Sequence, residues 1–220
     1  MTNDHRCGRS KGEEASLDPS NYFNDHYFSY EQVVTQSEQI RYVINSGKQK
    51  ILEIGKGNGF VSDFLKKAKR EVITFDLNAN LAPDVCGDIM DLNKIFKKNE
   101  FEFVLCAEVL EHLPFSSCEQ AIRDISQITS ECALITLPRA QKTILDFQFI
   151  LKVPKMRYKE GGIYWSKGKQ PVLREHHWEL DSSDETSLKK VKAIINLYFS
   201  AMEIRRIRYC PHHYFFNLKI

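Results

Sequence analysis

The stretch ILEIGKGNGF, residues 51–60, decides the fold of this chain. A short apolar run with Glu53 near its end leads into glycines at alternate positions, Gly55, Gly57 and Gly59. Glycines permit tight turns and close approach of the backbone to a ligand, and the exposed N–H groups of a helix start favour a polar or anionic group. We therefore predict a strand, a ligand-binding turn and a helix, with an ordinary strand–helix turn as the alternative.

The spacing of this turn narrows the class of ligand. It reads G-x-G-x-G, which differs from the G-x-G-x-x-G of dinucleotide sites. The carboxylate of Glu53 would repel a diphosphate and suits a ligand amine better. Lys56 occupies a variable position of the turn, and we expect its side chain to point outward.

Strands and helices alternate along the chain around this turn. The apolar runs predict strands at 50–54, 71–75, 83–86, 101–107 and 132–137. Helical spacing is found at 30–45, 60–68, 92–96 and 117–128. Near-continuous apolar strands are typical of strands covered on both faces. The sequence therefore predicts an α/β fold with a doubly wound, mostly parallel sheet.

The two ends of the chain and one internal segment depart from this rhythm. Residues 1–20 are polar and aperiodic, so we predict a flexible N-terminus before a single domain over 21–220. Residues 139–180 are aromatic but irregular and predict an insertion folded over one edge of the sheet. A helix over 183–199, capped by Asp181 or Ser182, and two antiparallel strands at 202–209 and 214–218 complete the prediction.

Composition excludes several classes of protein. The 220 residues are 42% hydrophobic and 27% charged, with a net charge of +2, so a disordered chain and a strongly basic nucleic-acid binder are not expected. The six cysteines lack the spacing of a zinc knuckle or a redox motif. No secretory signal and no apolar run of membrane-spanning length is present, so we expect a cytoplasmic protein with no membrane partner.

Three further motifs follow later strands. Asp76 ends the second strand, where a carboxylate can accept hydrogen bonds from both hydroxyls of a ribose; a helix-capping role is the alternative. Asp88 and Ile89 could meet the amine and the ring of a purine, although Asp88 could equally be a loop residue. Glu108, Glu111 and His112 crowd one loop after the fourth strand.

The order of these motifs resembles the class I S-adenosylmethionine-dependent methyltransferases, especially the small-molecule enzymes with an E-V-L-E-H-L-type loop. The resemblance covers residues 50–138. It implies a seven-stranded Rossmann-like sheet with an antiparallel last strand beside the fifth, and S-adenosylmethionine as cofactor with S-adenosylhomocysteine as product. It also implies a cofactor site made of Glu53, Gly55, Gly57, Gly59, Asp76, Leu77, Asp88, Ile89, Ala107 and Glu108.

Three residues are candidates for catalysis. His112 is the best base by type and location, with helix capping as its alternative, and Glu111 is either catalytic or a structural anchor. His177 or Trp178 could contact substrate, while His212 and His213 are assigned no role. We assign no metal, although the spacing Glu108-x-x-Glu111-His112 leaves divalent-cation binding open.

The function expected from the sequence is methyl transfer to an O, N or C nucleophile of a small-molecule or glycan-like acceptor. One alternative is an RNA methyltransferase that uses the basic run of the insertion, Lys152, Lys155, Arg157, Lys159, Lys167 and Lys169. Against it stand the near-neutral charge and the absence of an N/D-P-P-Y-type loop. Another alternative is a catalytically silent, cofactor-binding partner subunit. A monomer or a homodimer is expected.

Overall fold

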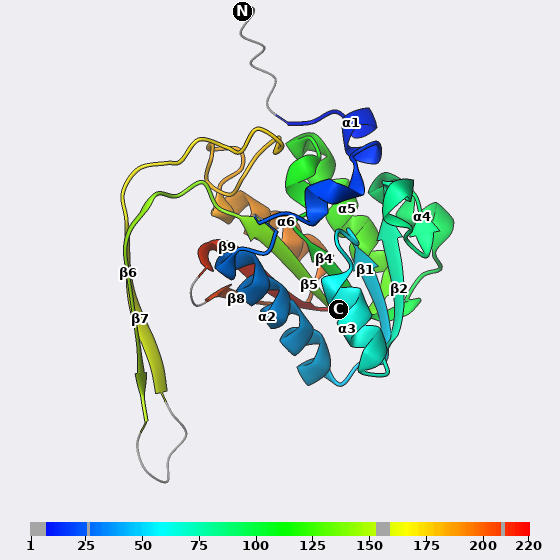
Figure 1. Ribbon diagram of the computed structural model, residues 1–220, viewed down its shortest axis with the longest axis horizontal. Coiled ribbons are helices and arrows are strands. Elements are labelled where there is room, and N and C mark those ends of the chain that lie inside the picture. The colour runs from blue at the N-terminus through cyan, green and yellow to red at the C-terminus, as the bar shows by residue number, and fades with distance from the viewer. Residues whose placement is uncertain (1–7, 26, 153–158, 208–209) are drawn as a thin grey trace, which may run out of the picture.

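The computed structural model describes residues 8–25, 27–152, 159–207 and 210–220. Its main feature is a seven-stranded sheet in the order β3-β2-β1-β4-β5-β9-β8 (Figure 1). The strands are β1 (Lys50–Ile54), β2 (Glu71–Asp76), β3 (Val85–Cys86), β4 (Phe101–Ala107), β5 (Thr129–Pro138), β8 (Ala201–Ile207) and β9 (Cys210–Lys219). The first five pair in parallel, and β9 lies antiparallel between β5 and β8. The predicted fold class is confirmed.

Helices cover both faces of the sheet, as the apolar strands predict (Figure 1). One face packs against α2 (Tyr30–Ser46) and α3 (Phe60–Lys67), and the other against α4 (Leu92–Ile95), α5 (Phe115–Ile128) and α6 (Leu188–Tyr198). Side chains of β4 alternate between the two cores: Phe103 and Leu105 belong to the first, and Val104 and Cys106 to the second. Burial on both faces therefore holds β4 in place, and β4 leads into the loop that carries Glu108, Glu111 and His112.

The C-terminal part differs from the prediction at two places. Helix α6 begins at Leu188 after the N-cap Ser187, later than predicted, because Asp181 adopts a φ of 61° and its carboxylate accepts the Leu188 N–H at 2.8 Å across a loop. The residues predicted as the turn of the last hairpin, 210–213, belong to β9, whose register with β5 continues to His213. Residues 208–209, between these two strands, lie outside the described residues.

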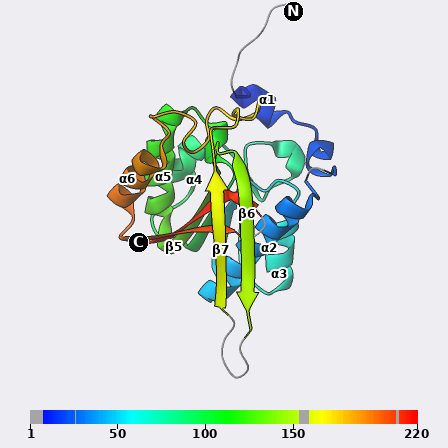
Figure 2. The same ribbon diagram turned by 90° about the vertical axis from the view of Figure 1, so that its left-hand side faces the viewer.

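The insertion forms a hairpin of its own. Strands β6 (Thr143–Leu151) and β7 (Lys159–Ser166) pair only with each other and project past the edge of the sheet next to β8 (Figures 1 and 2). The guanidinium of Arg206 in β8 lies 4.0 Å from the centre of the Tyr164 ring in β7, so the hairpin contacts the edge strand. The prediction that the insertion folds over this edge stays a prediction. Residues 170–177 return to the carboxyl ends of the parallel strands, where they line a cavity.

The N-terminus contains two short elements, α1 (Lys11–Ala15) and the 3₁₀ helix η1 (Pro19–Tyr22). Both lie near the carboxyl ends of the parallel strands (Figure 1). The flexibility predicted for residues 1–20 stays a prediction, and residues 1–7 of that segment lie outside the described residues. In the part of the chain that is described, no helix combines the length and apolarity needed to cross a membrane.

Candidate functional site

A cavity of about 1000 Å³ opens at the carboxyl ends of β1, β2, β4 and β5. This is the edge at which open α/β sheets bind their ligands. Of the ten residues predicted to bind cofactor, nine line the cavity; the exception, Gly59, is the N-cap of α3. The three predicted catalytic residues, Glu111, His112 and His177, line it as well. The structure thus brings these residues together, and their individual roles stay predictions.

The glycine turn is held in a shape that only glycine adopts readily. Gly55 and Gly57 have φ values of 84° and 53°, in the left-handed region. A Cβ atom on Gly55 would lie 2.4 Å from Cγ2 of Val109, so this glycine is also required by close packing. The Gly55 N–H donates to the carbonyl of Phe75 at 2.8 Å, which anchors the turn to β2. The turn is therefore fixed by neighbours on both sides.

Glu53 lies buried beneath this turn. Its Oε2 atom has no hydrogen-bond partner among the described residues. Burial raises the pKa of the Glu53 carboxyl to about 8, because the carboxylate loses its water without gaining an adjacent cation. A buried polar atom without a partner costs free energy unless a ligand supplies one. An ammonium group of a ligand would satisfy this carboxylate.

Asp76 holds the glycine turn from the next strand. Its two carboxylate oxygens accept the backbone N–H groups of Lys56 and Asn78, each at 2.8 Å. Burial raises the pKa of Asp76 despite these bonds. Each oxygen still has a lone pair, so the carboxylate could also accept from a ribose diol. The structural and the ligand-binding roles of Asp76 are therefore compatible.

Asp88 and Lys56 have partners that the sequence did not indicate. The Asp88 carboxylate caps the 3₁₀ helix η3 (Ile89–Asp91) through the Met90 N–H at 3.0 Å, and it also pairs with the ammonium of Lys11 at 2.5 Å. The Lys56 ammonium donates to the carbonyls of Leu81 and Ala82, both at 2.7 Å. Lys56 thus ties the turn to the loop after β2.

The N-terminal segment forms one wall of the cavity, which sequence reasoning missed. Glu14 contacts Nδ1 of His112 at 3.1 Å, and the Leu17 carbonyl accepts from the Asn78 side chain at 2.8 Å. The Gly8 N–H donates to the carbonyl of Arg174, which joins this segment to the returning part of the insertion. The capping box formed by Ser10 and Glu13 is the local sequence signal that could have revealed α1.

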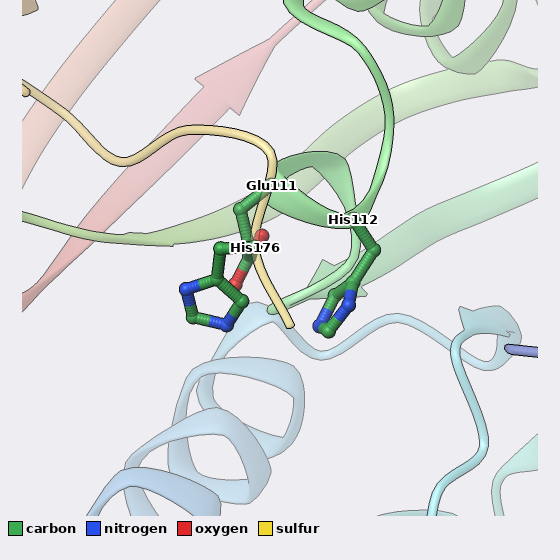
Figure 3. Close-up of side chains that lie close together, drawn as sticks. All are labelled: Glu111, His112 and His176. Carbon is green, nitrogen blue, oxygen red and sulfur yellow. The ribbon is translucent and has the colours of Figure 1, made fainter. Parts of the chain in front are cut away.

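Glu111, His112 and His176 form a compact cluster at this wall (Figure 3). One potential ligand atom from each lies within 4.8 Å of the others. Both Glu111 carboxylate oxygens are buried without a hydrogen-bond partner among the described residues, and burial raises the Glu111 pKa. Two imidazoles and a carboxylate are a donor set that Zn²⁺ accepts. These three residues could hold a divalent cation.

The carboxylates Glu14 and Glu179 orient the two imidazoles of this cluster. Glu14 lies 3.1 Å from Nδ1 of His112, and Glu179 lies 3.0 Å from Nδ1 of His176. Metal-ligating histidines commonly have such a carboxylate on the second ring nitrogen, because it fixes the ring orientation. Although burial opposes it, the contact with Glu14 raises the pKa of His112.

Glu108 is not part of this cluster and contacts a histidine that the sequence analysis had left without a role. Glu108 has a φ of 55°, which is rare for a residue with a side chain, and its carboxylate lies 3.5 Å from Nδ1 of His213. Although burial opposes it, the charge of Glu108 raises the pKa of His213 to about 10. The Glu108 carboxylate thus favours the protonated form of the partly buried His213 in the cavity wall. Its position depends on β9 pairing with β5, which no local pattern reveals.

The segment 176–179 divides between the cavity and the core. His177 lines the cavity, and its Nε2 lies 3.0 Å from the carbonyl of Arg9. Trp178, a candidate for substrate contact, is buried instead; its indole donates to the Leu113 carbonyl at 3.0 Å and packs edge-on against Phe115. Trp178 thus anchors the loop that carries His176 and His177.

Comparison with known proteins agrees with this geometry. Residues 52–135 match the family described as a methyltransferase domain. That match spans β1 to β5 and includes each predicted cofactor-binding residue. No curated protein sequence matches the chain.

Solved structures share the fold at low sequence identity. Magnesium protoporphyrin IX methyltransferase from Synechocystis PCC 6803, with bound SAH, is 11% identical over 95% of this chain and 97% of its own, with a TM-score of 0.59. A SAM-dependent methyltransferase from Archaeoglobus fulgidus is 14% identical over 92% and 100%, with a TM-score of 0.53. A 1,6-didemethyltoxoflavin-N1-methyltransferase from Burkholderia thailandensis is 13% identical over 96% of this chain and 90% of its own, with a TM-score of 0.53.

Substitution of Gly57 tests the role of the turn. Gly57→Val should abolish the thermal stabilisation given by S-adenosylmethionine, because branched methyl groups at a left-handed position deform the cavity floor. Gly47→Val is the matched control, since Gly47 has a φ of 73° in open space at the end of α2. Each substitution should cost about 1–3 kcal/mol of folding free energy in strain. Equal cofactor shifts in the two variants would contradict the assignment.

Calorimetric titration with metal tests the Glu111 cluster. We expect saturable heat from Zn²⁺ or Mn²⁺ in the wild-type protein and none in Glu111→Gln, because the amide cannot replace an anionic ligand. Glu185→Gln, which changes an exposed carboxylate, should titrate like the wild type. The absence of heat at millimolar metal, or equal heat in Glu111→Gln, would rule out the cation site.

Proposed function

We propose that this class I S-adenosylmethionine-dependent methyltransferase transfers a methyl group to a hydroxyl of a small, polar, glycan-like acceptor. The enzyme class and the cofactor follow from the methyltransferase-domain match together with the sheet order. The acceptor class is inferred from the part of the cavity wall that α2 forms. The single observation that carries this inference is the row of glutamines along α2.

Three glutamines of α2 face the cavity. Gln32, Gln36 and Gln39 follow helical spacing and share one side of the helix, and each lines the cavity. The Gln36 Oε1 atom is buried and has no hydrogen-bond partner in the described structure. An amide oxygen without a partner, on a residue that lines a cavity, favours a ligand that donates hydrogen bonds. A polyhydroxylated acceptor supplies such donors at several positions.

Histidines add to the polar character of this wall. The five histidines in the described ranges, His112, His176, His177, His212 and His213, each line the cavity. An imidazole can donate or accept, so such a wall suits hydroxyl groups. Among these residues, His112 and His177 remain our candidates for accepting the acceptor proton, with Glu111 beside them.

In this proposal one set of residues binds S-adenosylmethionine and another set binds the acceptor. S-adenosylmethionine, when bound, supplies a methyl group activated by its sulfonium. Glu53 would hold its ammonium group and Asp76 its ribose, while the glycine turn allows close approach of the backbone. The glutamine row and the histidines would orient the acceptor hydroxyl for in-line attack. Because the methyl group is already activated, positioning and exclusion of water would provide most of the catalysis.

The two alternatives from the sequence are less well supported. The described basic residues of the insertion, Lys152, Lys167 and Lys169, lie on or beside the projecting hairpin and do not line the cavity. Lys155 and Arg157 fall outside the described residues, and nothing is described of the Lys159 side chain. A basic surface leading RNA into the cavity is therefore not favoured. A catalytically silent, cofactor-binding subunit would bind S-adenosylmethionine without turnover, so an activity measurement distinguishes it from an active methyltransferase.

An acceptor panel and a glutamine variant test the proposed function. Formation of S-adenosylhomocysteine should be measured with simple glycosides, nucleotide sugars and RNA; we expect turnover with the hydroxylated small molecules. Gln36→Leu should raise KM for the acceptor by about tenfold, the worth of one lost hydrogen bond, with cofactor affinity unchanged. Gln127→Leu, on the exposed side of α5, is the matched control.

The panel also separates the alternatives. Turnover with RNA alone would overturn the acceptor assignment. Cofactor binding without turnover on any acceptor would favour the silent subunit. An unchanged KM in Gln36→Leu would remove the glutamine row from the acceptor site.

A further inference from the structure

The β6–β7 hairpin presents an apolar face that nothing in the described structure covers. In its register Leu145 pairs with Trp165, Phe147 with Ile163, Phe149 with Gly161 and Leu151 with Lys159. These pairs place six large apolar side chains on one face of the ribbon: Leu145, Phe147, Phe149, Leu151, Ile163 and Trp165. Each is between 47% and 62% exposed.

The opposite face of the hairpin is turned toward the domain. It carries Asp146, Gln148 and Tyr164, besides the exposed Ile150. The guanidinium of Arg206, from the edge strand β8, lies 4.0 Å from the centre of the Tyr164 ring. Because Tyr164 contacts β8, the apolar face lies on the side of the ribbon away from that strand. Figure 2 shows the course of the ribbon itself.

The apolar face is built as a continuous surface. The ring of Phe149 lies over Gly161, where a Cβ atom would come within 2.5 Å of it, and the rings of Phe147 and Phe149 are 6.4 Å apart. A two-stranded ribbon alone is marginally stable in water, and contiguous exposed apolar patches mark interaction sites. This ribbon is therefore expected to be stabilised by something that covers it.

The basic side chains around the hairpin indicate the kind of partner that covers the apolar face. Residues 139–170 contain eight basic and two acidic side chains, whereas the whole chain nets only +2. The exposed lysines Lys142 and Lys167 lie at the root of the hairpin, Lys169 lies beyond it, and the exposed Lys152 follows β6 at the far end. Among the described residues, no carboxylate forms an ion pair with these four lysines. Positive charge thus flanks the apolar face at both ends.

A second copy of the chain does not fit this arrangement well. Stacking two such faces about a two-fold axis would bring lysines of one copy against lysines of the other. An anionic lipid surface fits both features, because its acyl region accepts the apolar side chains and its headgroups attract the lysines. Trp and Phe are suited to the boundary between headgroups and acyl chains.

We propose that the outer face of the β6–β7 hairpin docks on an anionic lipid membrane, with Leu145, Phe147, Phe149, Leu151, Ile163 and Trp165 entering the interface and the flanking lysines contacting headgroups. This departs from the expectation of no membrane partner, which rested on the lack of a spanning segment. The hairpin lies on a membrane and does not cross it. The proposal is independent of the acceptor assigned above.

The tryptophans supply an intrinsic probe for docking. The chain has two, the exposed Trp165 on the apolar face and the buried Trp178 in the core. Vesicles of phosphatidylcholine mixed with phosphatidylglycerol should shift the Trp165 emission to shorter wavelength and carry the protein in flotation. Pure phosphatidylcholine vesicles should bind much more weakly, and added salt should weaken binding to the anionic vesicles. Trp165→Phe should still float but lose the emission shift.

Two variants separate the apolar and the charged contributions. Phe147→Ser with Phe149→Ser should lower binding to anionic vesicles at least tenfold, whereas Phe64→Ser, an equally exposed phenylalanine on α3, should change it less than about twofold. Lys142→Gln with Lys167→Gln should lower binding by about fivefold per lysine, with Lys98→Gln as control. Retained thermal stabilisation by S-adenosylhomocysteine shows that each variant is folded.

Three outcomes would overturn the proposal. The first is equal binding to anionic and neutral vesicles, or binding to neither. The second is unchanged binding in the Phe147 and Phe149 double variant. The third is a lipid-independent dimer in sedimentation that this double variant converts to monomer, which would assign the face to a second copy of the chain.

Discussion

The arrangement of the site depends on one constraint, a buried carboxylate beneath a left-handed turn. Glu53 lies next to the end of a strand that is covered on both faces, and its carboxyl is almost fully buried where it borders the cavity. Gly55 above it cannot carry a side chain, because Val109 occupies that space, and Asp76 fixes the Lys56 N–H from the neighbouring strand. The turn is therefore rigid where the carboxylate needs a cation, and a ligand must bring that cation to the turn.

Around this floor, segments far apart in the sequence build the rest of the cavity. The N-terminal residues Lys11 and Glu14 pair with Asp88 and His112, which come from loops after β3 and β4. The Asp88 carboxylate accepts the Met90 N–H on one oxygen and the Lys11 ammonium on the other, so an adenine amine would share these oxygens. Cofactor binding would thus compete with, or be shared with, the contacts that hold the N-terminal wall in place.

The local sequence pattern was sufficient to predict the residues of the cavity floor around the glycine turn. It was not sufficient to predict the residues of the cavity walls. Apolar runs, alternate glycines and acidic residues at strand ends are each encoded within a few residues, so Glu53, Gly57 and Asp76 could be placed from the sequence. The role of His213 requires the pairing of β9 with β5, and the place of Glu14 requires a contact with residue 112; no short-range signal carries either. The direction in which the hairpin extends could not be predicted, because the aromatic composition of residues 139–180 indicates order but does not show where the strands lie.

Calorimetry of proton release on ligand binding tests the central claim most directly. S-adenosylhomocysteine is the ligand of choice, since its ammonium is the cationic group that Glu53 would meet. With a pKa of about 8, Glu53 is mostly protonated at neutral pH, and the ammonium favours its ionised form. Binding at pH 7 in buffers of different ionisation enthalpy should release about one proton, and affinity should rise as the pH increases toward 8. Absence of proton release, or the same release in Glu53→Gln, would contradict the account.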